Sequence, residues 1–426
     1  MRSAGTTCRV RVAALAGLVC ATLLASPAPP AAGIEKAAGE VRALWVLRTS
    51  LTSPSAIDEM VRSARENGFN TLLVQVRGRG DAYYSSALEP RAADLQREPL
   101  TFDPLQHALA AARAASLGVH AWVNVNLVSS AVDLPLARTH IVLRHPSWLM
   151  VPRELADDLA RVKPESPAYV GRLARWTRAQ SDAIEGLYAS PAVPAAAAHA
   201  EAVVRDIARR YAVDGIHLDY ARYPSARFDY SPAAIAQFRA AVRPGLSAAV
   251  RQELDARSRD DVLAYPDALP DAWKAFRVGR MTALMERLRA AVKSVRPDAL
   301  VTMAAAPDIQ DAYDQKFQDW RGWLRAGLVD AVVPMAYTPE PGRFAEQITA
   351  ARDVAGGTRV WAGIGAYRLT ATQTVENIRT ARRIGTAGIV LFSYDSLVDP
   401  RQANADYLGT VGRSAFPRPT TAEGSR

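Results

Sequence analysis

Residues 214–224 read D-G-I-H-L-D-Y-A-R-Y-P, a short apolar run that changes abruptly into charged and aromatic residues. The run ends at Asp219, and Pro224 then prevents further strand pairing. Residues two apart on a strand point to the same side, so His217 and Asp219 share a face. The segment therefore predicts a buried strand whose carboxyl end presents a carboxylate. The residues around this carboxylate are Tyr220, Arg222 and Tyr223.

On both sides of this segment, strand-like apolar runs alternate with helical segments, which is the signature of parallel βα units. Strands are expected at 41–48, 71–76, 119–125, 215–218, 300–305, 331–335, 360–365 and 388–392. Helices are expected at 53–68, 103–118, 195–210, 272–296, 320–327, 343–355 and 370–385, with a last helical turn at about 402–408. Eight such units predict an α/β fold, the (β/α)8 TIM barrel, which needs about 250 residues. Long loops after strands 3 and 4, at 126–194 and 225–271, account for most of the remaining length.

The amino terminus differs from the rest of the 426-residue chain. Arginines precede an apolar run at 12–25, and a proline-rich stretch follows to Gly33, as in a secretory signal peptide. We therefore expect a signal peptide at 1–33, a barrel at 40–412 and a flexible tail at 413–426. The expected location is secreted or periplasmic, without stable membrane insertion of the mature form. The alternative is a transmembrane signal anchor.

Cysteine content and charge exclude several classes of function. Both cysteines, Cys8 and Cys20, lie in the predicted leader, so the mature chain is expected to have neither disulfides nor thiol catalysis. The formal net charge of +9 is compatible with an anionic polysaccharide or with a solvated arginine-rich surface. The chain has no basic run, zinc-finger spacing or RNA-binding aromatic signature, and we expect no nucleic-acid partner.

The third expected strand has two different faces. His120, Trp122, Asn124 and Asn126 have one parity, whereas the residues between them are all apolar. A strand buried on both faces is normally apolar throughout. The polar row is therefore predicted to line a site near the barrel mouth, and the alternative is a hydrogen-bond network in the barrel core.

Polar and aromatic side chains recur at the ends of the expected strands, which in a TIM barrel meet at one rim. They are Arg48, Arg77, Asp81, Asn124, Asn126, Asp219, Arg222, Asp308, Tyr337, Tyr367, Tyr394 and Asp395. Several carboxylates among aromatic and amide side chains are typical of carbohydrate chemistry. Glycoside hydrolysis requires one protonated and one ionised carboxyl group.

Other chemistries lack their sequence patterns. The six histidines form no zinc-ligand spacing, and neither a G-x-S-x-G elbow nor a dinucleotide fingerprint is present. We expect neither a metal nor a cofactor.

Five segments together resemble one family. They are E-V-R-A-L-W-V-L-R at 40–48, G-F-N-T-L-L-V-Q-V-R-G-R-G-D-A-Y-Y at 68–84, G-V-H-A-W-V-N at 118–124, V-D-G-I-H-L-D-Y-A-R-Y-P at 213–224 and V-D-A-V-V-P-M-A-Y at 329–337. They look like glycosyl-hydrolase-like family 10, also called the DUF187 family. The resemblance implies a barrel glycosidase of the bacterial envelope or exterior, and some relatives act on the glycan strands of peptidoglycan.

A second, partial similarity is to chitinase-type barrels, whose fourth strand reads D-G-x-D-x-D-x-E. Asp214, Gly215 and Asp219 match this pattern, but His217 replaces one aspartate and Ala221 stands at the position of the catalytic glutamate. The chitinase mechanism therefore does not transfer directly.

These observations predict a glycoside hydrolase that cleaves a β-linked envelope or extracellular glycan, with the peptidoglycan glycan strand favoured. The expected catalytic pair is Asp219 and Asp308, with Asp395, Glu340 and Asp81 as other candidates for the second carboxylate. The expected substrate-binding residues are Arg77, Asp81, Trp122, Asn124, His217, Tyr220, Arg222, Tyr223, Tyr337, Tyr367, Tyr394 and Asp395. The alternative function is a non-catalytic glycan-binding protein on the same barrel.

Overall fold

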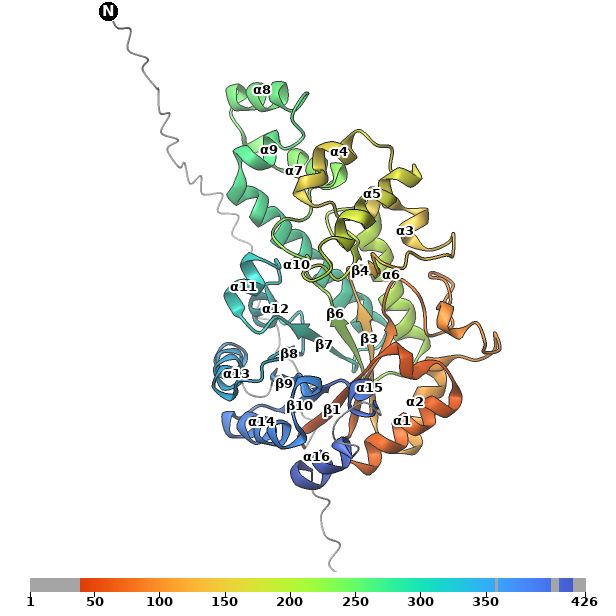
Figure 1. Ribbon diagram of the computed structural model, residues 1–426. Coiled ribbons are helices and arrows are strands. Elements are labelled where there is room, and N and C mark those ends of the chain that lie inside the picture. Colours follow the sequence, from red (N-terminus) through yellow and green to blue (C-terminus); the bar gives the residue numbers. More distant parts are fainter. Residues whose placement is uncertain (1–38, 357–358, 400–405, 417–426) are drawn as a thin grey trace, which may run out of the picture. The chain divides into compact units, whose positions relative to one another are not determined.

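The computed structural model describes residues 39–356, 359–399 and 406–416. The predicted signal peptide at 1–33 lies outside the described residues. At the centre is a sheet of eight parallel strands (Figure 1). In spatial order they are β8 (Ala331–Pro334), β7 (Leu300–Ala305), β6 (Gly215–Asp219), β3 (Gly118–Asn124), β2 (Thr71–Arg77), β1 (Val41–Val46), β10 (Gly388–Phe392) and β9 (Trp361–Ile364).

The sheet curls into a barrel. Its two outer strands, β8 and β9, meet through parallel bridges between Val332 and Val360 and between Met335 and Gly363. All eight strands coincide with those expected from the sequence to within two residues at either end. The predicted TIM barrel is confirmed.

Helices cover the outside of the barrel. The main ones are α1 (Pro54–Glu66), α2 (Pro104–Ala114), α6 (Pro194–Arg210), α10 (Pro270–Val295), α12 (Trp320–Arg325), α13 (Pro341–Ala355), α14 (Ala371–Ile384) and α16 (Tyr407–Ala415). The Ser53 and Asp103 side chains cap α1 and α2 by accepting hydrogen bonds from the backbone N–H groups of Ala56 and Gln106. α16 continues to Ala415, past the predicted end of the domain at residue 412. None of the described helices combines the length and hydropathy needed to cross a membrane.

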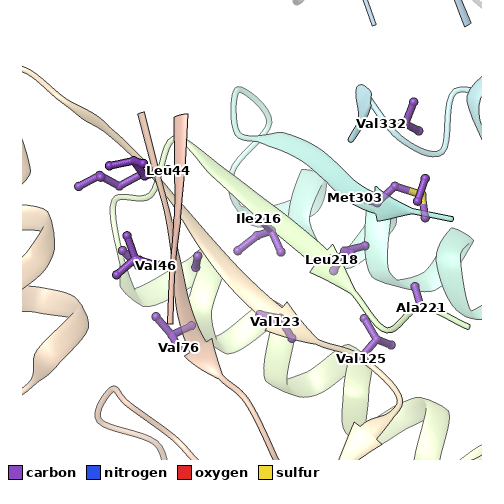
Figure 2. Packing of buried hydrophobic residues seen from close by; sticks show 14 of the residues in the cluster. Leu44, Val46, Val76, Val123, Val125, Ile216, Leu218, Ala221, Met303 and Val332 are labelled. Carbon is purple, nitrogen blue, oxygen red and sulfur yellow. The ribbon is translucent and has the colours of Figure 1, made fainter. Parts of the chain in front are cut away.

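The main core lies between the strands and the surrounding helices. Strand residues of one parity, such as Val46, Ile216 and Val332, point outward into this layer (Figure 2). Residues of the other parity fill the barrel interior, where Trp45, Trp122 and Trp361 belong to a second buried cluster. This alternation is what a strand period of two requires in a closed barrel.

Small residues make room for the large interior rings. A Cβ atom on Gly215 would lie 2.5 Å from the His120 ring, and one on Gly388 would lie 3.0 Å from the Trp361 ring. These glycines are required because another chain segment approaches closely. The polar face predicted for β3 points into this interior, since Trp122 contacts His217 on β6 edge to face.

The first long connection, which follows β3, contains small elements of its own. They are β4 (Leu127–Ser129), α3 (Ile141–Arg144), η3 (Pro146–Trp148), η4 (Arg153–Leu155), α4 (Ala156–Ala160), α5 (Pro167–Arg178) and β5 (Leu187–Tyr188). The β4 and β5 strands pair antiparallel, which returns the connection to the barrel rim. This small sheet was not expected from the sequence.

The second connection, which follows β6, contains α7 (Pro232–Val242), η5 (Arg243–Gly245), α8 (Ala248–Arg257) and α9 (Ala264–Ala268). It packs against the first connection, because the Tyr230 N–H donates to the Val151 carbonyl at 2.8 Å and the Val151 N–H donates to Asp229 Oδ1 at 2.9 Å. In Figure 1 the helices of both connections gather beyond the ends of β3 and β6. Both predicted long loops are confirmed, and together they form one wall beside the barrel mouth.

Candidate active site

A cavity of about 250 Å³ opens at the carboxyl ends of the barrel strands. This is where TIM-barrel enzymes place their chemistry, and the volume is slightly below the range of about 300–1,000 Å³ common for small-molecule sites. Its aromatic side chains are Trp45, Trp122, Tyr220, Tyr337 and Phe392. Its charged side chains are Arg48, Arg79, Glu185, Asp219 and Arg222.

Asp219 is the last residue of β6, and its exposed fraction is only 6%. Its Oδ1 accepts hydrogen bonds from the Tyr220 N–H at 2.6 Å and from Arg222 Nη1 at 3.4 Å. Within the described chain, Oδ2 makes no hydrogen bond, which leaves it for a ligand. Burial raises the pKa of the Asp219 carboxyl group above its ordinary value, although Arg222 opposes this shift.

The turn after β6 holds Asp219 in place. Tyr220 has a φ of 50°, in the left-handed region that side chains other than glycine rarely occupy. Such strain is typical of functional sites. This turn directs the Tyr220 N–H back to Asp219 and places the Tyr220 ring 4.1 Å from the Arg222 guanidinium carbon. The Val125 N–H fixes the same turn by donating to the Asp219 carbonyl at 2.7 Å.

The second carboxylate of the cavity is Glu185, which precedes β5 in the first long connection. Its Oε1 accepts a hydrogen bond from Arg222 Nη2 at 3.1 Å, and its Oε2 accepts one from the Tyr188 hydroxyl at 2.6 Å. Partial burial alone would raise the pKa of Glu185, but Arg222 and Tyr188 lower it below its ordinary value. Its side chain is 41% exposed, so it remains open to a ligand.

Arg222 thus lies between two carboxylates of different character. Nη1 faces Asp219 and Nη2 faces Glu185, so one rigid guanidinium group sets the positions of both. The pKa of Asp219 is raised and that of Glu185 is lowered. Carboxyl groups with pKa values shifted in opposite directions are the arrangement that acid–base catalysis requires.

A buried polar layer supports the cavity from below. The Trp45 indole N–H donates to His217 Nε2 at 3.0 Å, and His217 Nδ1 lies 3.0 Å from Thr302 Oγ1. Because Nε2 accepts, we assign the proton of neutral His217 to Nδ1. Burial keeps the pKa of His217 well below its ordinary value. His217 is therefore a neutral support for Trp45, which lines the cavity.

Residues 40–380 match the glycosyl hydrolase-like 10 family. The chain belongs to the glycosyl hydrolase-like 10 family. The family expected from the sequence is confirmed.

Two curated relatives carry glycosyl hydrolase names. Glycosyl hydrolase DigH of Escherichia coli is 25% identical over 337 residues, which cover 72% of this chain and 65% of that protein. Glycosyl hydrolase YngK of Bacillus subtilis is 21% identical over 333 residues, which cover 70% of this chain and 54% of that protein. The chain thus spans less than two thirds of the length of these curated relatives.

Among solved structures, the glycoside hydrolase domain of PgaB (BpsB) from Bordetella bronchiseptica aligns with a TM-score of 0.60 and 15% sequence identity. The alignment covers 87% of this chain and 98% of that domain. At this identity the likeness concerns the fold alone. It agrees with the glycosidase-type barrel of the glycosyl hydrolase-like 10 family.

In this family member, the structure brings only part of the predicted site together. The predicted residues that line the cavity are Trp122, Asn124, Asp219, Tyr220, Arg222 and Tyr337. Trp122 Nε1 donates to Asn124 Oδ1 at 2.9 Å, so these two neighbours on β3 form one fixed surface. Burial, and next the negative charge of Asp219, raise the pKa of Tyr337, so its hydroxyl group is neutral beside that carboxylate.

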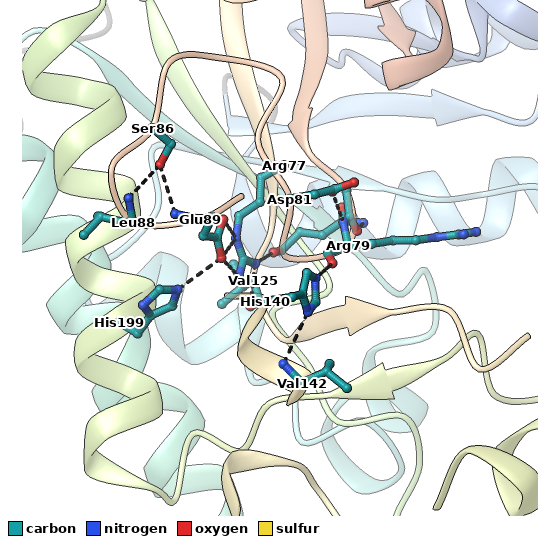
Figure 3. A network of polar contacts seen from close by, with 12 residues as sticks. Arg77, Arg79, Asp81, Ser86, Leu88, Glu89, Val125, His140, Val142 and His199 are labelled. Carbon is teal, nitrogen blue, oxygen red and sulfur yellow. Dashed lines mark hydrogen bonds and ion pairs between the residues drawn. The ribbon is translucent and has the colours of Figure 1, made fainter. Parts of the chain in front are cut away.

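Arg77 lies in a closed cluster and does not line the cavity (Figure 3). Its Nε and Nη2 atoms donate to the Glu89 carboxylate at 2.6–3.0 Å, and both side chains are almost completely buried. Glu89 also contacts His199 Nε2 at 3.1 Å. Arg77 further donates to the backbone carbonyl of Val125, so it stabilises the fold around the ends of β2 and β3.

Three predicted carboxylates serve as local anchors outside the cavity. Asp308 is exposed and caps α11 (Ile309–Asp314) by accepting a hydrogen bond from the Asp311 N–H at 2.8 Å. Asp395 accepts from the Leu47 N–H at 2.7 Å and from the Ser50 hydroxyl at 2.6 Å. Asp81 accepts from the Arg79 N–H at 3.0 Å. Glu340, the fourth candidate, is exposed at the start of α13 and also lies outside the cavity.

The remaining predicted aromatic residues do not line the cavity. Tyr223 is fully buried against Phe317, and Tyr394 packs in the main core. Tyr367 is 44% exposed, and its ring contacts Tyr337 at a centroid distance of 6.2 Å. Tyr367 is therefore an open aromatic surface beside the cavity.

Sequence reasoning missed Glu185 as a site residue. A Cβ atom on the next residue, Gly186, would lie 2.0 Å from the Ser129 carbonyl oxygen, so β4 approaches the backbone closely there. The sequence shows only the glycine and not this approach. Nothing in the sequence spacing connects this glutamate with Asp219. Within the described residues, no group of three or more histidine, cysteine, aspartate or glutamate side chains is arranged to hold a metal ion.

Proposed function

We propose that the protein is a glycoside hydrolase whose catalytic pair is Asp219 and Glu185. The observation that carries this proposal is the position of Arg222 between these two carboxylates, whose pKa values are shifted in opposite directions within one aromatic cavity. Glu185 replaces Asp308 as the proposed second carboxylate, because Asp308 is engaged in capping α11.

In the proposed reaction, Asp219 is the general acid. Burial raises the pKa of its carboxyl group, so Asp219 keeps a proton to higher pH than an exposed aspartate does. This proton moves from the carboxyl group to the glycosidic oxygen as the bond from that oxygen to the anomeric carbon breaks. Glu185 remains ionised and stabilises the positive charge that develops on the sugar ring. In the inverting alternative, Glu185 takes a proton from the water that attacks the anomeric carbon. In the retaining alternative, Glu185 bonds to the anomeric carbon, and water that gives its proton to the ionised Asp219 then breaks this bond.

The other cavity residues suit a sugar ring. The half-buried rings of Tyr220, Tyr337 and Phe392 offer apolar surfaces to a sugar ring, and the buried Trp45 and Trp122 pack beneath them. The favoured substrate is the glycan strand of peptidoglycan, as the family resemblance implies. A secreted or periplasmic location, proposed from the predicted signal peptide, would bring the protein to this polymer.

The proposal is tested by incubating the purified protein with peptide-stripped glycan strands and with intact peptidoglycan. Soluble fragments with new reducing ends are then measured by mass spectrometry. We expect release by the wild-type protein and none by Asp219→Asn. Binding to the glycan without release would instead support the non-catalytic glycan-binding protein.

A further inference from the structure

Among the described residues, no carboxylate is bound to two arginines of the cavity. Arg48 and Arg79 both line the cavity, and neither forms an ion pair with any residue that the structure describes. Burial, and next the like charge of Arg48, lower the pKa of Arg79. Two guanidinium groups that repel each other in a partly buried cavity are a favourable site for an anion.

The Arg48 side chain is held in a defined position. Its Nη1 donates to Oε1 of the buried Gln75 at 3.1 Å. It also lies against the backbone of Gly78, where a Cβ atom would be only 2.8 Å from Nη1. The absence of a side chain at Gly78 therefore makes room for this guanidinium group, and Gln75 fixes its orientation.

The Arg79 backbone is anchored equally well. Its N–H donates to Asp81 Oδ1 at 3.0 Å, and its carbonyl oxygen lies 2.8 Å from His140 Nε2. Gly80 follows with a φ of 71°, a conformation that favours glycine. Figure 3 shows the Arg79 side chain extending away from the Arg77–Glu89 pair. Asp81 and Asp133 are the carboxylates whose charges partly offset that of Arg79.

Arg48 and Arg79 follow different barrel strands from the one that carries Asp219. Arg48 follows β1 and Arg79 follows β2, which are neighbours, whereas β3 lies between β2 and the strand that carries Asp219. An anion on the arginines would therefore lie beside Asp219 and Glu185 within the same cavity.

We propose that Arg48 and Arg79 form a subsite for a carboxylate carried by a sugar next to the cleaved bond. Guanidinium groups match the planar geometry of carboxylates, and charge-assisted hydrogen bonds are roughly twice as strong as neutral ones. This inference rests on the proposed glycoside hydrolysis and narrows the substrate class to acidic glycans. The carboxylate is either the lactyl group of a muramic-type sugar or the C6 carboxylate of a uronic acid.

Binding and hydrolysis are measured separately on three probes. They are peptide-stripped glycan fragments that carry lactyl carboxylates, the same fragments with the carboxyl groups reduced to alcohols, and a uronic acid oligosaccharide. Dissociation constants come from calorimetry with the full chain, and hydrolysis is followed by reducing ends. The variants are Arg48→Gln, Arg79→Gln and Arg79→Lys, with Arg379→Gln on the exposed surface of α14 as the matched control. Thermal unfolding checks that each variant is folded.

We expect the wild-type protein and Arg379→Gln to bind one acidic probe at least about tenfold more tightly than the reduced fragments. The acidic probe that binds more tightly identifies the source of the carboxylate. In Arg48→Gln and Arg79→Gln, the ratio of the dissociation constant for the reduced fragments to that for the acidic probe should fall towards one. Arg79→Lys should keep part of the wild-type ratio.

Equal affinity of the wild-type protein for acidic and reduced fragments would overturn the subsite. So would a preference that survives both glutamine substitutions. Hydrolysis without this preference would overturn the subsite and leave the proposed function intact. Preference without hydrolysis would show that the two arginines bind a carboxylate but would contradict the proposed function.

Discussion

Arg77 and Arg222 occupy similar positions in the sequence, near the ends of barrel strands, but they have different roles in the structure. Each lies at or just beyond the carboxyl end of a barrel strand and contacts carboxylate oxygens. Around Arg77 the partner Glu89 is completely buried and is shared with His199. Around Arg222 the partners face a cavity, and Glu185 is 41% exposed.

The two clusters differ in whether their carboxylate oxygens are all bonded within the protein. Although burial alone would raise the pKa of Glu89, Arg77 and His199 lower it to about 2, so this group is ionised at any ordinary pH. Asp219 instead has a raised pKa and a free Oδ2 within the described chain. The buried cluster around Arg77 stabilises the fold. The cluster around Arg222 faces the cavity, and its two carboxyl groups have pKa values shifted in opposite directions, which suits it to proton transfer.

The largest effect on activity is expected from Asp219→Asn. The amide cannot donate a proton to the leaving oxygen, so the rate of glycan cleavage should fall by about 10²–10⁴-fold or more. Asparagine has nearly the same volume, and the thermal unfolding midpoint should change by only a few degrees. Cleavage near the wild-type rate in a folded Asp219→Asn protein would remove this residue from the mechanism.

Glu89→Gln should have the largest effect on stability. It leaves Arg77 buried beside a neutral amide, which should cost about 3–5 kcal/mol of the free energy of unfolding, as measured by chemical denaturation. Glu376→Gln, which breaks an exposed pair on α14, is the matched control and should cost about 0–1 kcal/mol.

The same Glu89 variant makes a prediction about pH. The pKa of Glu89 is lower in the folded protein than in the unfolded chain. The stabilising contribution of Glu89 to the free energy of unfolding is therefore fully present above about pH 4.5. The contribution is lost as the pH falls towards about 2. The difference in unfolding free energy between the wild type and Glu89→Gln should therefore shrink over this interval, and a constant difference would contradict the buried ion pair.

Glu185→Gln tests the role of the second carboxylate beside Arg222. Wild-type activity should follow a bell-shaped pH profile, limited at low pH by protonation of Glu185 and at high pH by ionisation of Asp219. In Glu185→Gln the rate should fall by about 10²-fold and the acidic limb should disappear. The exposed Asp182→Asn on the same connection is the control, and an unchanged acidic limb in Glu185→Gln would assign it to another group.

Asp308→Ala should have the smallest effect. Removing the N-cap of α11 should cost about 1 kcal/mol of stability and leave the rate of glycan cleavage within about twofold of the wild type. A loss of activity as large as that of Asp219→Asn would restore Asp308 as the second carboxylate.

The sequence by itself determined the eight strands and the position of Asp219 at the carboxyl end of one of them. Both follow from local patterns, because the period of two in a strand and the capping residues of a helix act over a few neighbouring positions. The polar face of β3 was predictable for the same reason. Trp122 and Asn124 point into the barrel together.

Only the tertiary structure decided which charged residues meet. Glu185 reaches Arg222 because the first long connection folds back through the β4–β5 pair. Arg77 is closed off because Glu89 and His199 reach it from other elements. Which arginine meets which carboxylate depends on the path of the long connections and on burial. Neither can be predicted from short-range periodicity in the sequence.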